Sequence, residues 1–257
     1  MFTRFIRLGL PCISLNDQGR CRPSIMELFK WRYPTLKNLP NVLDKHSPYG
    51  YANAGFRFEY QFINVPDFDG KGETAPRPHY YQNLAEAEYV VATYMFMVLI
   101  GYPAEKITIL TTYNGQKDLI RDIIRHKCSW NPIFKKPGKI TTVDKFQGQQ
   151  NDYILMSLVR SETVGHFRDP RRLTVAISRA RLGLYVFGRY DLFNNCYELR
   201  EAFRYFQHRP KNLLLIPGEK FPTTRNSESA DDPTNLMMIE GFQEMYKVVQ
   251  KLLEERI

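Results

Sequence analysis

Residues 141–152 read TTVDKFQGQQND, and after one apolar run residues 169–181 read DPRRLTVAISRAR. The first stretch is a glycine turn between two β-prone apolar runs. The second predicts an amphipathic helix over residues 170–181, with Asp169 as its N-cap and Pro170 at the first helical position. A strand, a glycine turn, a second strand and a helix in this order are typical of an α/β fold with a parallel sheet.

The chain around these stretches repeats the same alternation. Asn83 caps a helix that ends before Gly101, and further helices are predicted from residue 115 and near 197–207. Strands are predicted at residues 106–110, 140–143, 153–159 and 183–188, with a weaker one at 212–216. Because these strands are continuously apolar, we expect a parallel sheet covered by helices on both faces, a three-layer α/β domain.

The two ends of the chain and one internal segment depart from this pattern. Residues 1–35 predict a helix belonging to the fold, a short strand near Ile13 and a second helix entered through Pro23. Residues 36–82 are rich in Pro, Gly and Asn, with one strand-like run at 60–65, and are interpreted as a surface insertion within a domain of residues 1–215. Residues 216–257 form a C-terminal extension, with a polar break at 222–233. Its docking helix carries Met238, Phe242, Met245, Val249 and Leu252 at helical spacing.

Composition favours a globular protein with a polyanionic partner. The 257 residues carry a net charge of +9, and 43% of them are hydrophobic. Seven arginines lie between Arg160 and Arg189, against two acids, so the positive charge is localised. Nucleic acid is a better match than a membrane surface, and no apolar run reaches the ~18–20 residues that span a bilayer. The four cysteines lie far apart without ligand spacing, so no metal site is predicted.

The helix predicted over 170–181 indicates where its arginines lie. Leu173, Ala176, Ile177 and Ala180 form a buried stripe. Arg172 and Arg179 then share one flank of the stripe, and Arg181 falls on the other. For Arg171 and Arg181 we favour solvated surface side chains. For Arg179 we favour function, because a rigid guanidinium group beside a sheet edge can stabilise a transferring phosphoryl group.

The glycine turn contributes candidate residues of its own. At Gly148 the missing side chain allows backbone N–H groups to approach a ligand. Gln147 is placed to orient a water molecule or to bond to a phosphate, and Asp144 to cap the turn or to pair with an arginine. The FQG triplet alone is more often an ordinary turn, so it is the spacing to the arginine helix that makes the pair specific.

These motifs resemble superfamily 1 helicases. TVDKFQGQQND resembles their motif V, DPRRLTVAISRAR their motif VI and ILTTYNGQ (109–116) their motif IV, while Gln18-Gly19-Arg20 resembles the segment that begins their second RecA-like domain. The resemblance covers nearly the whole chain. The details FQGQQNDYILMSLVR, GHFRD and FPTTR resemble the branch that binds introns and acts in pre-mRNA splicing.

The resemblance implies a role for several residues. Arg179 would be the arginine finger, with Arg20 as a second γ-phosphate arginine and Gln147 beside them. Gly148, Gln150 and Arg172 would also contact the nucleotide, which is ATP with Mg²⁺ held jointly with an N-terminal RecA-like domain. Contacts to the nucleic-acid backbone would come from Thr112, Tyr113 and Thr142. Many relatives have Glu where this chain has Gln150, and an amide can still bond to a ribose hydroxyl.

Three functions follow as hypotheses. No G-x-x-x-x-G-K-[S/T] phosphate loop occurs in the sequence, so no ATP hydrolysis is expected from the chain alone. The first hypothesis is the C-terminal motor domain of an ATP-dependent RNA helicase, with single-stranded pre-mRNA intron and spliceosomal proteins as partners and a nuclear location. The second is the same domain of a DNA helicase or an RNA-decay helicase. The third is a non-enzymatic RNA- or protein-binding fragment, and a start in mid-architecture suggests a fragment.

Overall fold

A parallel sheet forms the centre of the protein. The computed structural model describes residues 2–227 and 235–256. Five parallel strands are ordered β3-β9-β8-β6-β7. Their bounds are β3 Tyr60–Asn64, β6 Ile107–Thr111, β7 Lys139–Thr142, β8 Asn151–Ser157 and β9 Ala180–Gly188. Because all five run the same way, the sheet has one edge of strand beginnings and one edge of strand ends, and these edges carry different candidate residues.

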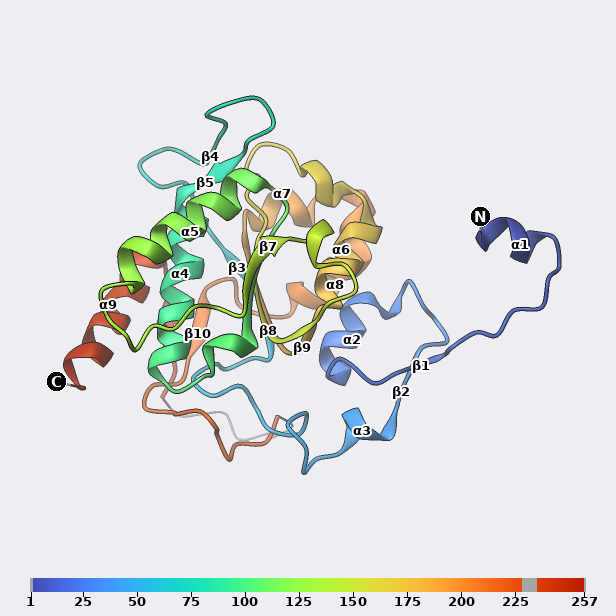
Figure 1. The fold of residues 1–257 in the computed structure, drawn as a ribbon, viewed down its shortest axis with the longest axis horizontal. Coiled ribbons are helices and arrows are strands. Elements are labelled where there is room, and N and C mark those ends of the chain that lie inside the picture. The colour runs from blue at the N-terminus through green and yellow to red at the C-terminus, as the bar shows by residue number, and fades with distance from the viewer. Residues whose placement is uncertain (1, 228–234, 257) are drawn as a thin grey trace.

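Helices cover both faces of the sheet (Figure 1). One face packs against α4 Leu84–Leu99, α5 Asn114–Cys128 and α9 Phe242–Glu254. The other packs against α2 Pro23–Lys30, α6 Pro170–Ile177, α7 Tyr190–Asn194 and α8 Arg200–Gln207. Each face has its own apolar core, as expected for continuously apolar strands. The expected three-layer, RecA-like α/β architecture is confirmed.

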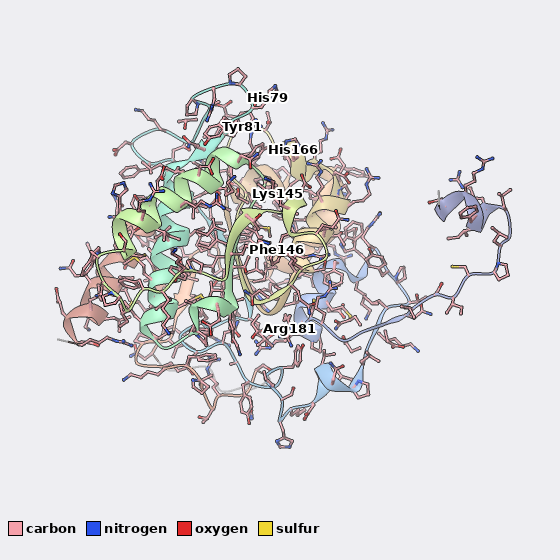
Figure 2. The ribbon with its side chains drawn as sticks, viewed as in Figure 1. His79, Tyr81, Lys145, Phe146, His166 and Arg181 are labelled. Atoms are coloured by element: carbon pink, nitrogen blue, oxygen red, sulfur yellow. The ribbon has the colours of Figure 1, made fainter. Side chains whose placement is uncertain are left out.

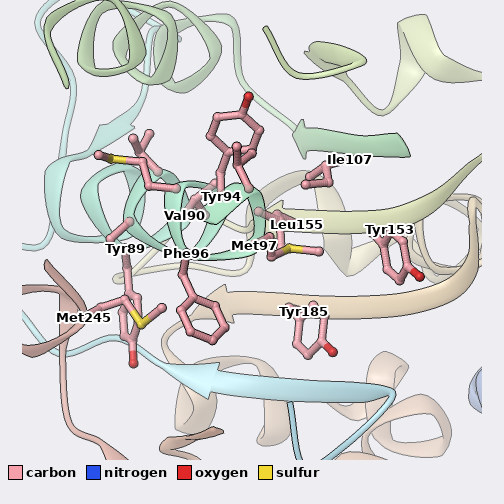
Figure 3. Packing of buried hydrophobic residues seen from close by; sticks show 14 of the residues in the cluster. Tyr89, Val90, Tyr94, Phe96, Met97, Ile107, Tyr153, Leu155, Tyr185 and Met245 are labelled. Carbon is pink, nitrogen blue, oxygen red and sulfur yellow. The ribbon is translucent and has the colours of Figure 1, made fainter. Parts of the chain in front are cut away.

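Helix α4 is the most deeply buried helix of the first face. The Asn83 side chain accepts a hydrogen bond from the Glu86 amide, which confirms the predicted N-cap. Figure 3 shows Met97 of this helix beside Leu155 of β8, and Tyr89 beside Met245 of α9. Apolar side chains surround nearly the whole helix, which is typical of a helix enclosed between a sheet and other helices.

Shorter elements connect these layers. The two-stranded pairs are β1 Asp17–Gln18 with β2 Lys37–Asn38, β4 Glu73–Thr74 with β5 Gln82–Asn83, and β10 Leu213–Leu215 with β11 Met237–Ile239. The remaining short helices are α1 Phe2–Arg7 and α3 Pro40–Leu43, with the 3₁₀ turns η1 Ala104–Lys106, η2 Asp144–Phe146, η3 Gly165–Arg168 and η4 Tyr197–Leu199.

The interpretation of residues 36–82 as a surface insertion was wrong for part of that range. Tyr60–Asn64 is β3, an edge strand of the main sheet that pairs in parallel with β9. Phe56 is buried just before it, with its ring stacked 4.2 Å from that of Tyr185. The strand-like run at 60–65 was recognised, but its place in the main sheet was not. Its partner β9 lies more than a hundred residues later, and local composition carries no signal of such pairing.

The N-terminal segment also differs from expectation. Helix α1 forms, but it lies away from the body of the protein, and its described side chains are exposed (Figure 1). No strand forms near Ile13, whose side chain is 91% exposed, and β1 begins only at Asp17. The expected helix is therefore present, but within the described residues it is not packed into the fold.

The C-terminal segment docks on the same domain. Met245 and Val249 of α9 are buried against α4, and the Tyr246 hydroxyl donates to the Glu88 carboxylate. Met238 was expected in this helix but lies in β11 and is exposed. Of the predicted break at 222–233, residues 228–233 lie outside the described residues. In the described part, Arg225 is ion-paired with Glu219 at 2.8 Å, which anchors this stretch to the body.

Candidate functional site

Two arginines distant in sequence meet at the edge where the strands begin. Arg20 follows β1 and Arg179 immediately precedes β9. Both line a hollow of about 390 Å³. The other lining residues are Asp17, Gln18, Gly19, Cys21, Phe29, Tyr33, Thr174, Val175 and Ser178. The expected association of Arg20 with Arg179 is thus present in the geometry.

Backbone carbonyls hold Arg179 in place. Its Nε donates to the carbonyl of Val175 at 2.8 Å, and its Nη1 donates to the carbonyl of Gln149 at 3.0 Å. The helix predicted to reach residue 181 ends at Ile177, because the chain turns at Ser178 and pairs with β8 from Ala180 onward. The rigidity expected from a helical position therefore comes from main-chain acceptors on α6 and on the turn before β8.

The charges of these two arginines are not neutralised by acids. Arg20 donates to the carbonyl of Ser178 at 3.2 Å, and within the described residues neither Arg20 nor Arg179 forms an ion pair. Arg179 is only 8% exposed, and burial together with the nearby charge of Arg20 lowers its pKa. Burial also raises the pKa of Cys21 to about 12, so this neighbouring thiol stays neutral. Two adjacent cations without a carboxylate partner favour an anionic ligand.

The glycine turn runs along the same edge. Gly148 has φ +80°, a conformation that favours glycine, and a side chain there would meet no other atoms. The requirement for glycine is thus conformational. Gln147, Gly148 and Gln150 are exposed. Hydrogen bonding to Arg179 comes instead from Gln149, whose carbonyl was not predicted to take part.

The other arginines of the motif divide into three cases. Arg171 is exposed and paired with Asp169, which confirms the surface interpretation. Arg172 lies 3.9 Å from Asp144, one of the two contacts expected for that acid. The interpretation of Arg181 as a solvated helix residue was wrong: it lies in β9 and pairs with buried Asp152 and with the Tyr49 hydroxyl. Asp152 lies on the neighbouring strand, so sequence spacing did not reveal this pair.

The opposite edge, where the strands end, carries the other candidate residues. Thr111 of β6 pairs in register with Thr142 of β7, and Thr112 and Tyr113 follow directly. Within the described chain, neither the Thr111 nor the Thr112 hydroxyl has a hydrogen-bond partner, although both oxygens are buried. Buried polar atoms are rarely unsatisfied, so these two hydroxyl groups mark the edge as a place for a polar ligand.

Tyr113 is the centre of an aromatic cluster at this edge. Its ring is 5% exposed and lies 5.1 Å from both the Tyr81 ring and the His166 ring. In the view of Figure 2, Tyr81 and His166 lie in the upper part of the body and Arg181 lies below its centre. The guanidinium group of Arg160 lies 4.0 Å from the Tyr81 ring and pairs with Glu73 of β4 at 2.9 Å. The contact of Tyr113 with nucleic acid stays a prediction, while its burial was not anticipated.

A buried polar network fixes the backbone that leads to Arg160. Glu86 is buried and accepts hydrogen bonds from the Ser157 hydroxyl at 2.6 Å and the Val159 amide at 2.7 Å. Val159 has φ +74°, which is costly for a β-branched residue. Burial raises the pKa of Glu86 to about 8. The Asn83–Glu86 motif therefore does two things: it caps α4 and holds a strained turn at the end of β8.

The donor set fits a phosphate group better than a metal ion. The described residues contain no group of three or more His, Cys, Asp or Glu side chains placed to hold a metal. Two guanidinium groups without acid partners match phosphate oxygens. None of the helices in the described ranges combines the length and apolarity needed to cross a bilayer.

The chain matches one family model and aligns with curated relatives over most of its length. The family model AAA_12, described as an AAA domain, matches residues 1–191. RNA helicase aquarius of Mus musculus is 54% identical over 252 residues, which are 98% of this chain and 17% of that protein. Pre-mRNA-splicing factor cwf11 of Schizosaccharomyces pombe is 33% identical over 100% of this chain and 20% of its own length.

A third relative, the regulator of nonsense transcripts 1 homolog of Arabidopsis thaliana, is 30% identical over 73% of the chain and 15% of that protein. The chain thus spans a fifth or less of the length of these relatives. The family match over residues 1–191 and the alignment of nearly the whole chain with an RNA helicase show that this chain belongs to the AAA_12 family, a family of superfamily 1 helicase domains.

Proposed function

We propose that the chain is the C-terminal motor domain of an ATP-dependent RNA helicase that acts in pre-mRNA splicing. In this function residues 1–215 form the second RecA-like domain and residues 216–257 an extension docked on it through α9. The domain supplies arginines to a nucleotide and part of a track for a single RNA strand. Similarity to RNA helicase aquarius and to pre-mRNA-splicing factor cwf11 supports the choice of RNA and splicing.

The pair of arginines at the strand-beginning edge carries the nucleotide part of the proposal. Arg179 and Arg20 face one hollow, and within the described chain no acid neutralises them. ATP bound with Mg²⁺ on a separate phosphate-loop domain would bring its γ-phosphate to these groups. Arg179 would then stabilise the charge that develops during phosphoryl transfer, while Gly148, Gln147 and Gln150 would border the nucleotide. Arg172, which the motif also assigns to the nucleotide, lies at the opposite end of α6 beside Asp144.

The opposite edge supports the RNA part. Thr112 and Thr142 lie where β6 and β7 end, and backbone contacts of this kind position a strand without reading its sequence. The net charge of +9 fits a polyanionic partner. Nuclear residence and contact with spliceosomal proteins follow as proposals from the splicing-related relatives. The regulator of nonsense transcripts 1 relatives support RNA decay as the second candidate.

A chimera tests this proposal. The matching 252 residues of mouse RNA helicase aquarius are replaced by this chain, and ATP hydrolysis is measured with and without single-stranded RNA. We expect RNA-stimulated hydrolysis by the chimera and none by the isolated chain. Turnover of ATP by the isolated chain, or an inactive but folded chimera, would contradict the assignment as one half of a motor.

RNA binding is measured separately on the isolated chain. The affinity for a labelled single-stranded RNA should fall steeply between low and moderate salt, because phosphate neutralisation releases counterions. Affinity that does not change with salt would contradict the proposed track.

A further inference from the structure

His166 occupies an exposed position on top of a buried aromatic ring. Its side chain is exposed in the η3 turn, whereas Tyr113 beneath it is buried. The two ring centroids lie 5.1 Å apart with 34° between the ring planes, a tilted contact. The His166 amide also donates to the Tyr113 hydroxyl at 3.3 Å. One face of the imidazole is therefore supported by the protein.

The turn before His166 is built to allow this approach. Gly165 has φ +61°, and a Cβ atom there would lie 2.3 Å from the Tyr113 hydroxyl oxygen. A side chain at this position would strain the backbone and displace the tyrosine. Glycine at this point is what permits the imidazole to sit on Tyr113.

Tyr113 is in turn fixed from its other sides. The Tyr81 ring makes a T-shaped contact with it, with the two ring centroids 5.1 Å apart and 71° between the planes, and the Arg160 guanidinium group lies 5.8 Å from the centre of the Tyr113 ring. Glu73 holds that guanidinium group and also accepts hydrogen bonds from two backbone amides of the following turn. The support below His166 is thus rigid, while Tyr113 has almost no surface of its own to offer a ligand.

The electrostatics favour a neutral ring flanked by cations. Burial, followed by the positive charge of Arg172, lowers the pKa of His166, while Asp144 opposes the shift and Arg160 and His79 add to it. The imidazole is consequently uncharged near pH 7. A neutral aromatic ring offers a stacking face, and the partly exposed Arg172 nearby offers charge to a phosphate backbone.

We propose that His166 is a stacking site for one nucleobase of a single strand that lies across the strand-end edge, with Tyr113 as the positioning residue beneath it. This inference rests on the proposed RNA track. It adds a contact to a base, where the threonines contact only the backbone. Because every base has a π face, the site accepts any nucleobase and requires only that the base be unpaired.

The test compares two strands and four proteins by fluorescence anisotropy near pH 7.5. One labelled RNA carries ordinary bases, and the second has the same length and backbone with abasic positions throughout. The proteins are the unchanged chain, His166→Ala, His166→Phe and a matched control, His126→Ala, which removes an exposed histidine from α5. Thermal denaturation of each protein reports its folding.

We expect His166→Ala to weaken binding of the ordinary strand by roughly 5- to 150-fold, the range of one lost stacking contact. His166→Phe should bind within about twofold of the unchanged chain, since it keeps the ring and discards the nitrogens. His126→Ala should have no effect. On the abasic strand the unchanged chain and His166→Ala should bind equally, and the salt dependence should match because no phosphate contact is lost.

The possible failures are distinguishable. If the unchanged chain binds the ordinary strand with the expected salt dependence, and His166→Ala binds it with the same affinity, then the stacking proposal is wrong and the RNA track stands. If His166→Ala weakened binding of the ordinary and the abasic strand equally, this would indicate a backbone contact and overturn the inference. A folded His166→Phe that binds as weakly as His166→Ala would do the same. If the unchanged chain does not bind RNA, the track and the stacking site fail together.

Discussion

Two arginine sites at opposite edges of the sheet differ in what surrounds their positive charge. At the strand beginnings, Arg20 and Arg179 are held by carbonyl groups and keep their charge. At the strand ends, Arg160 is neutralised by Glu73 and covered by the Tyr81 ring. The arginines of the first site have no carboxylate partner within the described residues, and in this sense we call that edge incomplete: it suits an anionic ligand. At the second site Arg160 already has a carboxylate partner, and we call that edge complete. Its ion pair holds aromatic rings and loops in place.

The largest expected effect is on catalysis at the incomplete edge. In the chimera, Arg179→Ala should lower RNA-stimulated ATP hydrolysis by about a thousandfold or more, as for other arginines that stabilise a transferring phosphoryl group. Steady-state phosphate release measures it. Arg171→Ala, which removes an exposed arginine paired only with Asp169, is the matched control and should retain near-normal activity. A similar loss in both variants would refute a special role for Arg179.

The complete edge should depend on its ion pair for stability. Glu73→Ala leaves the Arg160 guanidinium group without its carboxylate partner in a mostly buried site, at a cost of about 3 kcal/mol or more. For a chain of this size that corresponds to a fall in Tm of roughly 6–12 °C. Differential scanning fluorimetry measures the shift.

The comparison predicts that Arg179→Ala lowers the Tm of the isolated chain by less than Glu73→Ala does. That change removes a buried charge which has no acid partner within the described residues, so the lost hydrogen bonds are partly offset by relief of desolvation. Equal destabilisation by Glu73→Ala and Arg179→Ala would break the proposed contrast between the two edges.

The buried carboxyl behind the complete edge should make stability depend on pH. The pKa of Glu86 is raised by burial from 4.5 to about 8. Its stabilising contribution is therefore fully present below about pH 4.5 and is lost as the pH rises toward 8. Glu86→Gln removes this titration, so its Tm should improve relative to the unchanged chain between about pH 5 and pH 8. A difference in Tm that is constant over this range would contradict a titrating Glu86.

The smallest effect concerns a single hydroxyl group. Thr112→Val removes a buried oxygen that has no partner in the described chain, so stability should stay the same or rise slightly. RNA affinity should fall by about two- to fivefold if that oxygen bonds to the strand. Thr35→Val, at an exposed site, is the control for both measurements. Unchanged affinity would remove Thr112 from the track.

Local pattern was sufficient for much of the fold. The cap at Asn83, the apolar strands and the stripe of Leu173, Ala176 and Ile177 were all predicted and found. It failed where a distant partner decides the outcome. Strand β3 depends on β9, and the end of helix α6 depends on pairing of Ala180 with β8. Local sequence preference allows a segment more than one secondary structure, and pairing with a distant strand decides which one forms.

The candidate residues show the same division. The sequence by itself determined which side chains the motifs carry, the period of the apolar runs, and so the parallel α/β class. It placed Arg20 and Arg179 in one site only through resemblance. The tertiary structure decided which arginines keep their charge: Arg181 meets Asp152 and Arg160 meets Glu73, while within the described residues Arg20 and Arg179 meet only carbonyls. The reason is physical: neutralisation and burial depend on distances of a few ångströms between residues far apart in the chain.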